Sequence, residues 1–315
     1  MSFEKPTVVV VGAGAMGGLF GGLLAEGGLD VTLVDAAADH IAAIKERGLR
    51  IVGVGGDRFI PIKATSDPSE IRAADVVLFQ CKAFANQTAA HGVKHLFNGR
   101  AAAISFQNGL GNEATLEAIL GKGTVIGGLT AQAGLVEAPG VVRNLGDLPT
   151  HIGEIPGGLS ERVVSIAKAF TAHGLPTIAT AEIKREKWKK LLGNVALGAI
   201  SAVTDFRSFE IMRVPELQVT VFRLIDEAAA VAKAEGVVLD VAEAREVLMK
   251  LVDTSGGGTG TSKSSMREDI IRRRPTEIDT IHGAVAKLAR QHGIDTPTLD
   301  CLIALVKGIQ STYVN

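Results

Sequence analysis

The chain has 315 residues, of which 46% are hydrophobic and 21% are charged, a composition typical of globular proteins rather than disordered ones. Its 33 basic and 34 acidic residues leave a formal net charge of -1, which gives no argument for binding nucleic acid or an anionic membrane. Two cysteines and seven scattered histidines match neither a disulfide framework nor the spacing of metal ligands, so no metal site is expected.

The first part of the chain alternates strand-like and helix-like segments. The expected strands cover residues 8–11, 30–34, 74–79, 101–106 and 124–128, and the first two helices end near residues 26 and 47. This alternation predicts βαβ units and a parallel sheet. Residues 7–25 carry no charge, but they hold six glycines and lack a preceding basic run, so they do not resemble a signal peptide. We therefore expect a cytoplasmic protein without a membrane segment.

Beyond about residue 180, apolar residues recur at spacings of three and four, which is typical of helices. The expected helices cover residues 183–204, 209–235, 240–253, 266–273, 275–292 and 296–312. This pattern predicts an α/β domain over residues 1–180 and an all-α domain over residues 181–315. The glycine-rich run 256–260 is interpreted as a mobile edge of the substrate site.

A glycine motif joins the first strand to the first helix. Gly12 permits a tight turn, Gly14 lets a pyrophosphate approach the backbone, and Gly17 allows close packing of the helix. The residues expected to bind the cofactor here are Gly12, Ala13, Gly14, Ala15, Met16 and Gly17. The helix N-terminus adds free N–H groups and a partial positive charge. The alternative is a glycine-rich turn that binds nothing, but the complete context favours a Rossmann-type dinucleotide site.

Asp35 ends the second strand, 21 residues after Gly14, where an acid that binds the adenine ribose is expected. Its carboxylate can accept hydrogen bonds from both ribose hydroxyls and would repel a 2′-phosphate. Residues 36–38 are alanines, so no arginine stands ready for that phosphate. The sequence therefore favours NAD, and NADP remains the alternative if a loop cation binds the phosphate.

Lys190 and Asn194 are four residues apart and share one helix face. Asn194 lies in an uncharged run over residues 191–204, so we expect it to be buried and to need partners. A lysine at the edge of such a run can have its pKa lowered toward values useful in proton transfer. The alternative for Lys190 is a solvated cation within a cluster of lysines at positions 184, 187 and 189.

Three further polar positions have structural alternatives. Ser265 and Glu268 have the spacing of a capping box, so Ser265 is also interpreted as the start of a helix. Glu277 follows a Pro-Thr pair and is also explained as a first-turn acid. Asn108 precedes Gly109 in a dipeptide that favours turns.

Together these motifs resemble the ketopantoate reductase (2-dehydropantoate 2-reductase) family over nearly the whole chain. The resemblance rests on the segments 12–17, 81–83, 107–111, 190–194, 264–266 and 276–279. It implies a Rossmann domain, a helical domain like that of 6-phosphogluconate dehydrogenase, and a substrate cleft between them. It further implies Lys190 as general acid, Glu277 as a carboxylate on the substrate hydroxyl, and a homodimer. The remaining implied ligands are Asn194 and Ser265 for the substrate, Asn108 near the nicotinamide and the reacting carbon of the substrate, and Lys82 for the cofactor.

This chain departs from the family pattern at three places. Gly198 stands where a second substrate-binding Asn is common, which enlarges the pocket. His282 stands where another Asn is frequent in the family. Asp35 and Ala36 stand where the family usually has an Arg that binds NADP. The departures favour an NAD-dependent D-2-hydroxyacid dehydrogenase-like enzyme acting on a 2-keto or 2-hydroxy acid. The alternatives are a 3-hydroxyacid dehydrogenase of the related superfamily and a catalytically silent nicotinamide-binding protein.

Overall fold

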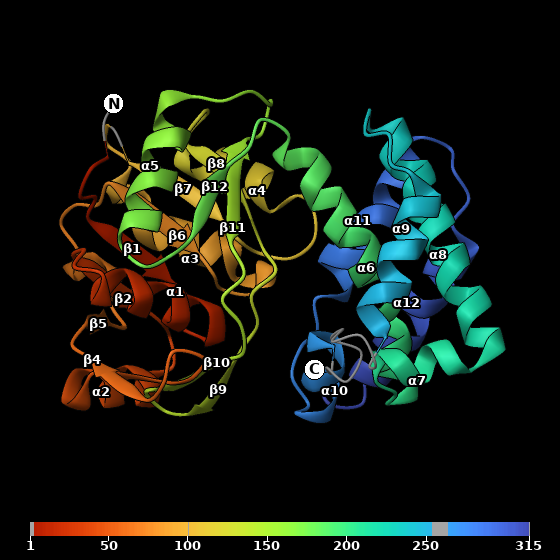
Figure 1. Ribbon diagram of the computed structural model, residues 1–315, viewed down its shortest axis with the longest axis horizontal. Helices are drawn as coiled ribbons and strands as arrows, with labels where there is room; N and C mark the ends of the chain where they lie inside the picture. Colours follow the sequence, from red (N-terminus) through yellow and green to blue (C-terminus); the bar gives the residue numbers. More distant parts are fainter. Residues whose placement is uncertain (1–2, 100, 254–263, 315) are drawn as a thin grey trace. The chain divides into compact units, whose positions relative to one another are not determined.

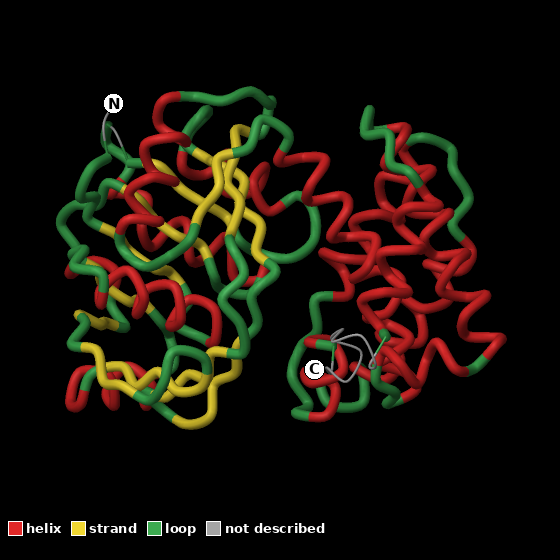
Figure 2. Tube along the Cα trace, in the orientation of Figure 1, coloured by secondary structure: helices red, strands yellow, loops and turns green. Residues whose placement is uncertain are grey.

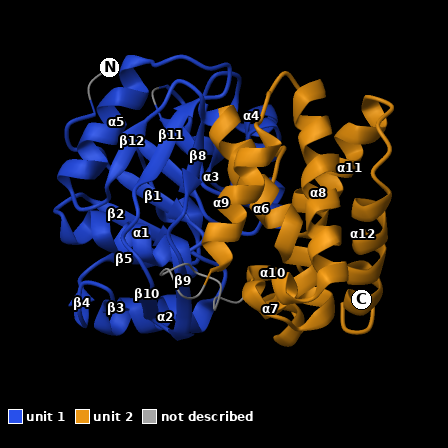
Figure 3. Ribbon diagram, turned by 45° about the vertical axis from the view of Figure 1, so that its right-hand side comes forward, with its two compact units in different colours: residues 1–107, 112–183 blue, residues 108–111, 184–315 orange. Residues whose placement is uncertain are grey.

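A computed structural model of the protein describes residues 3–99, 101–253 and 264–314. The chain divides into two compact units (Figure 3). The first comprises residues 1–107 and 112–183, and the second comprises residues 108–111 and 184–315. The glycine-rich run 256–260 lies outside the described residues. None of the helices in the described ranges is both long and apolar enough to cross a bilayer.

The larger sheet of the first unit has the strand order β12-β11-β8-β7-β6-β1-β2-β5. Its strands are β1 (Val8–Val11), β2 (Val31–Val34), β5 (Lys63–Thr65), β6 (Val76–Phe79), β7 (Ala102–Ser105), β8 (Val125–Thr130), β11 (Thr150–Glu154) and β12 (Thr177–Ala179). From β5 to β8 the strands are parallel, as predicted. The strands β11 and β12 were not predicted from the sequence; β11 runs antiparallel to β8 and parallel to β12.

Both faces of this sheet are covered, which explains the continuous apolar run in β1. Val8 and Val10 join one buried cluster, and Val9 and Val11 join another. Alternate residues of a strand point to opposite faces, so a four-valine strand requires a core on each side. The covering helices are α1 (Ala15–Glu26), α2 (Ala38–Arg47) and α5 (Glu161–Ala172) for the first cluster, and α3 (Asn86–Val93) and α4 (Asn112–Leu120) for the second (Figure 1).

A second, smaller sheet was not expected from the sequence. Its strands have the order β4-β3-β10-β9. They are β3 (Leu49–Gly53), β4 (Arg58–Ile60), β9 (Gly134–Ala138) and β10 (Val141–Asn144) (Figure 2). Val142 and Ile51 of this sheet belong to the same buried cluster as Leu19 of α1, so the small sheet packs against that helix.

The second unit is helical in its described part. Its helices are α6 (Ile183–Thr204), α7 (Ser208–Arg213), α8 (Pro215–Ala234), α9 (Val241–Val252), α10 (Ser265–Ile271), α11 (Ile278–Gln291) and α12 (Pro297–Gln310). The prediction of one helix over residues 209–235 is wrong, because α7 ends at Arg213 and Pro215 begins α8. Proline lacks the N–H that a helix interior needs but is well suited to a first turn. Trp188 and Leu224 are among the buried residues of the core.

Candidate functional site

The glycine motif forms a narrow turn at the carboxyl end of β1. Gly12 has φ +96°, and a Cβ there would lie 2.4 Å from the backbone nitrogen of Cys81. A Cβ on Gly17 would lie 1.7 Å from the carbonyl oxygen of Gly12, so the helix begins directly against the turn. In contrast, no atom of the described residues would lie within 4 Å of a Cβ on Gly14. The open backbone at Gly14 therefore fits a pyrophosphate group at the N-terminus of α1.

Two side chains hold this turn in place. Asp35 Oδ2 accepts the Ala13 N–H at 2.7 Å, and its Oδ1 accepts the Ala37 N–H at 2.9 Å. His40 Nε2 donates to the carbonyl oxygen of Ala13 at 3.0 Å, while its Nδ1 accepts the Gly140 N–H at 3.1 Å. The role of this buried histidine was not predicted from the sequence. A carboxylate has about four lone-pair sites, so Asp35 retains acceptor capacity for ribose hydroxyls.

The segment that follows β6 is fixed by a network of buried amides. Gln107 Nε2 donates to the carbonyl oxygen of Cys81 at 2.7 Å and to Asn86 Oδ1 at 2.6 Å. Asn86 Nδ2 in turn donates to Asn112 Oδ1 at 2.9 Å. Lys82 lies within this anchored segment, directly after Cys81, whose backbone borders the glycine turn at Gly12. This arrangement is compatible with the cofactor contact that the resemblance implies for Lys82.

In the second unit, Lys190 meets the short segment 108–111. Lys190 Nζ donates to Asn108 Oδ1 at 3.0 Å. The segment is held by the N–H of Leu110, which donates to the carbonyl oxygen of Thr280 at 3.0 Å. A Cβ on Gly109, which has φ +84°, would lie 2.1 Å from that same oxygen. The structure thus brings Asn108 and Lys190 together, and Gly109 is needed for the approach.

The ammonium group of Lys190 has an altered acidity. Burial lowers the pKa of Lys190 to about 8, and the negative charge of Glu277 acts in the opposite direction. Glu277 lies directly before α11 and is 7% exposed, so it is not a solvated first-turn acid. Its charge acts on Lys190. Lys187 is also buried, at 8% exposed, which makes the idea of a wholly solvated lysine cluster wrong. Burial, and then the charge of Lys190, lower the pKa of Lys187 to about 7.

Asn194 and Gly198 follow on the same helix, at intervals of four residues from Lys190. Asn194 is only partly buried, contrary to expectation. Gly198 is buried, and a Cβ there would meet His282 Cε1 at an ordinary 3.8 Å. His282 is fully buried, its Nε2 donates to the carbonyl oxygen of Val195 at 3.0 Å, and burial lowers its pKa to about 4. A neutral imidazole therefore lies beside the position where the family's second amide is missing.

The helix start at α10 differs from the predicted one. The capping oxygen belongs to Ser264, which accepts the N–H of Arg267 at 3.1 Å. Ser265 is the first helical residue and is exposed, so its role as the cap is wrong. An exposed hydroxyl beside the Gly198 turn is compatible with the substrate contact that the resemblance implies, since Ser264 Oγ lies 3.5 Å from the carbonyl oxygen of Gly198.

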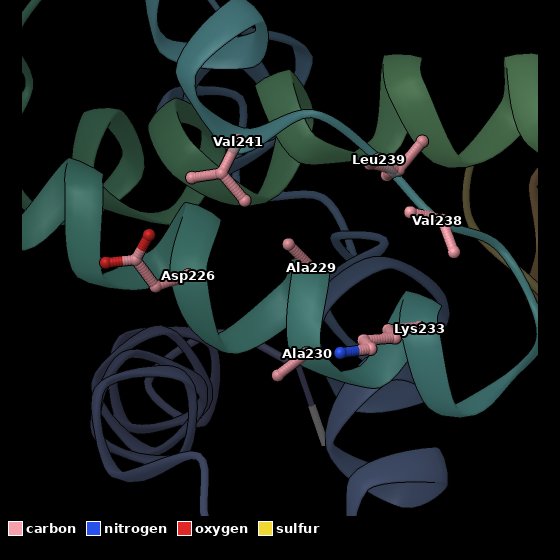
Figure 4. A pocket seen from close by; sticks show the side chains of 7 residues that line it. All are labelled: Asp226, Ala229, Ala230, Lys233, Val238, Leu239 and Val241. Atoms are coloured by element: carbon pink, nitrogen blue, oxygen red, sulfur yellow. The ribbon is translucent and has the colours of Figure 1, made fainter.

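A pocket of about 270 Å³ lies elsewhere in the second unit (Figure 4). It is lined by Asp226, Ala229, Ala230, Lys233, Val238, Leu239 and Val241. Asp226 is already paired with Arg245 at 2.5 Å, and none of the candidate catalytic residues lines this pocket. Within residues 3–99, 101–253 and 264–314, no group of three potential metal-binding side chains comes together.

Comparison with known families identifies both parts of the chain. The sequence model of the family described as ketopantoate reductase PanE/ApbA matches residues 8–157. The corresponding C-terminal model matches residues 182–310. Together these two matches span most of the chain.

Individual relatives agree with this result. The chain is 36% identical to a 2-dehydropantoate 2-reductase of Halobacterium salinarum, over 95% of this chain and 97% of the relative. Its identity to a protein of the same name from Pyrococcus abyssi is 32%, over 96% and 97% of the two chains. Among solved structures, D-mandelate dehydrogenase with NADH and anilino(oxo)acetate superposes with a TM-score of 0.91 at 25% identity, covering 97% and 99%. A PanE/ApbA family ketopantoate reductase from Ralstonia eutropha superposes with a TM-score of 0.89 at 30% identity, covering 98% and 100%.

Proposed function

Because this chain belongs to the ketopantoate reductase family of nicotinamide-dependent 2-keto acid reductases, we propose that it uses NADH and that Lys190 is the proton donor. The observation that carries the proposal is the Lys190–Asn108 hydrogen bond in a partly buried setting beside Glu277. Such a constellation holds an ammonium group where an alkoxide could take its proton.

The chemistry divides between the cofactor and the chain. When bound, the nicotinamide supplies a hydride to the carbonyl carbon of the keto acid. Lys190 gives a proton from Nζ to the carbonyl oxygen as negative charge develops there, and in the oxidation direction it takes that proton back. Asn108 fixes the position of Nζ through its side-chain oxygen. The charge of Glu277 favours the protonated form of Lys190. The amide of the partly buried Asn194 provides a hydrogen-bonding group for the substrate.

The acidity of Lys190 predicts a pH dependence. Reduction requires the protonated amine, so we expect kcat for keto acid reduction to fall as the pH rises through about 8. Glu277→Gln removes the charge that raises the pKa of Lys190, so the fall should begin at lower pH. Initial rates at saturating NADH and keto acid between pH 6 and pH 10 measure both profiles. Glu186→Gln is the matched control, because Glu186 pairs with Lys189 on the surface. If kcat fell over the same pH range in Glu277→Gln as in the unaltered protein, the assignment of Lys190 as the proton donor would be contradicted.

The position of Asp35 predicts the preferred cofactor. We expect NADH to bind at least about tenfold more tightly than NADPH, because the carboxylate accepts ribose hydroxyls and repels a 2′-phosphate. Asp35→Asn removes the repulsion and should bring the two dissociation constants closer together. Fluorescence titration with each cofactor measures the ratio, and Asp39→Asn is the control at an exposed site on α2. Tighter binding of NADPH by the unaltered protein would show that Asp35 does not face the ribose.

The space at Gly198 points to a substrate with a larger or less hydroxylated side chain than ketopantoate. A missing amide removes a hydrogen-bonding group, and the neighbouring His282 presents a carbon edge at this point. Ketopantoate itself remains the second candidate, because relatives with up to 36% identity carry that activity in their names. Initial rates with a panel of 2-keto acids, including ketopantoate and aryl keto acids, decide between the two. Absence of turnover on every acid would contradict the function.

The homodimer and the cytoplasmic location stay predictions. The dimer rests on analogy within the family. Light scattering coupled to size-exclusion chromatography measures the subunit number directly.

A further inference from the structure

Gln132 has a buried side-chain amide without a hydrogen-bond partner among the described residues. It lies two residues beyond the end of β8 and is 8% exposed. Its backbone N–H donates to Thr130 Oγ1 at 3.0 Å. Neither the oxygen nor the nitrogen of its side chain has a hydrogen-bond partner among the described residues. Buried side-chain amides in proteins are nearly always hydrogen-bonded, so the amide of Gln132 is an exception that needs a physical reason.

The neighbouring strand shows what a purely structural glutamine looks like here. Gln107 lies two residues beyond the end of β7 and is 7% exposed. Its Nε2 donates to Cys81 and to Asn86, and its Oε1 accepts the hydroxyl of Ser105 at 3.1 Å. Both glutamines lie two residues beyond the ends of adjacent parallel strands, although β8 extends further than β7. Among the described residues, Gln107 has side-chain hydrogen-bond partners and Gln132 has none.

The place of Gln132 in the sheet suggests a ligand. Strands β6 and β7 separate β1 from β8, and neighbouring strands lie about 4.8 Å apart, so β8 lies about 14 Å from β1 across the sheet. The strand β8 also extends beyond Gly127, the residue paired with the end of β7. It lies on the side opposite to β2, which carries Asp35. In dinucleotide-binding sheets the adenine half occupies one side of the turn and the second nucleotide the other. The chain then runs from Gln132 toward the turn, since a Cβ on Gly134 would lie 3.5 Å from the carbonyl oxygen of Ala15.

We propose that Gln132 positions the nicotinamide ring by pairing its amide with the ring's carboxamide. Each of the two amides has one acceptor and one donor group, so they can form two complementary hydrogen bonds. The inference rests on the nicotinamide-dependent function above, and it requires the side chain of Gln132 to rotate toward the ligand, because both amide atoms are buried. This pairing would satisfy both ends of Gln132 at once and fix the face of the ring toward the substrate.

The test compares two ligands that differ in the nicotinamide. ADP-ribose contains the adenine half, the pyrophosphate and the second ribose but no nicotinamide ring. Gln132→Leu should raise the dissociation constant for NADH about tenfold and leave that for ADP-ribose unchanged, as measured by calorimetric titration. The melting temperature of the ligand-free variant should equal or exceed that of the unaltered protein, because an unpaired amide is removed.

Gln107→Leu is the matched control. It removes an amide of similar burial that is already paired, so it should lower the melting temperature of the ligand-free protein. Equal weakening of NADH and ADP-ribose binding by Gln132→Leu would overturn the proposal, and so would unchanged binding of both. If the unaltered protein bound ADP-ribose but not NADH, the nicotinamide-dependent function itself would fail. That outcome is visible before any variant is examined.

Discussion

Replacing Lys190 with alanine is expected to lower kcat for keto acid reduction about a thousandfold, within the range of about 10²–10⁴ that general acid catalysis contributes. A thousandfold loss corresponds to about 4 kcal/mol of transition-state stabilisation. NADH binding should change little, because the glycine turn and Asp35 belong to the first unit, whereas Lys190 belongs to the second. Stopped-flow single turnovers give the rate, and fluorescence titration gives the dissociation constant for NADH.

The neighbouring lysine provides the control for this experiment. Lys189 is exposed and pairs with Glu186 at 3.5 Å, so Lys189→Ala removes one positive charge from the same helix without touching Asn108. We expect its kcat to stay within about twofold of the unaltered value, since surface ion pairs of this kind contribute little. Equal loss in the two variants would mean that helix stability, rather than proton transfer, explains the effect.

A pair of glycine substitutions should separate folding from cofactor binding. Gly17→Ala places a Cβ 1.7 Å from the carbonyl oxygen of Gly12, so the turn must shift. Both the melting temperature and NADH affinity should fall, the latter by about a hundredfold or more, since correct placement of the N–H groups is lost. Gly14→Ala meets no atom of the described residues within 4 Å, and its φ of −60° suits alanine. This variant should keep its melting temperature but bind NADH at least about tenfold more weakly, because a methyl group occupies the space of the pyrophosphate.

Differential scanning fluorimetry with and without NADH measures both quantities in one experiment. Unchanged NADH affinity in Gly14→Ala would place the pyrophosphate away from this backbone. A stable Gly17→Ala protein with normal affinity would contradict the tight contact between α1 and the turn.

The elements with strong local signals were predictable. The strand Val8–Val11 and the helix Ile183–Thr204 have the predicted bounds, because a β-branched run and a long helical period each carry their own information. The glycine motif was predictable because a side chain is excluded at two of its positions, each for its own reason. At Gly12 the tight turn leaves no room for a Cβ, and at Gly17 the close packing of the helix against the turn leaves none. Lys190 was predicted from its place at the edge of an uncharged run, and the roles of Lys190 as general acid and of Asn108 came from the resemblance. The contact between the two residues could not be derived from spacing.

Other features depend on contacts that no local pattern records. The small sheet contains the three-residue strand Arg58–Ile60, which is too short for an alternation to be recognised. Lys187 is buried although it lies in a segment rich in charged residues, because α6 packs one face into the core. The hydrogen bonds of His40 join residues that are tens of positions away in the sequence. The amide of Gln132 has no hydrogen-bond partner among the described residues, which no sequence pattern indicates.

The segment Asn108–Gly111 has a consequence for exchange of parts between relatives. The chain enters the second unit for four residues, returns, and leaves again near residue 183, so the two units are interleaved in sequence. A chimaera joined at residue 183 would combine the Lys190 of one parent with the Asn108 of another. It would also bring a foreign residue against Gly109, where the carbonyl oxygen of Thr280 leaves no room for a side chain. The segment that has to be exchanged as a unit is therefore discontinuous: the helical part and the four-residue loop have to come from the same parent for Lys190 and Asn108 to stay matched.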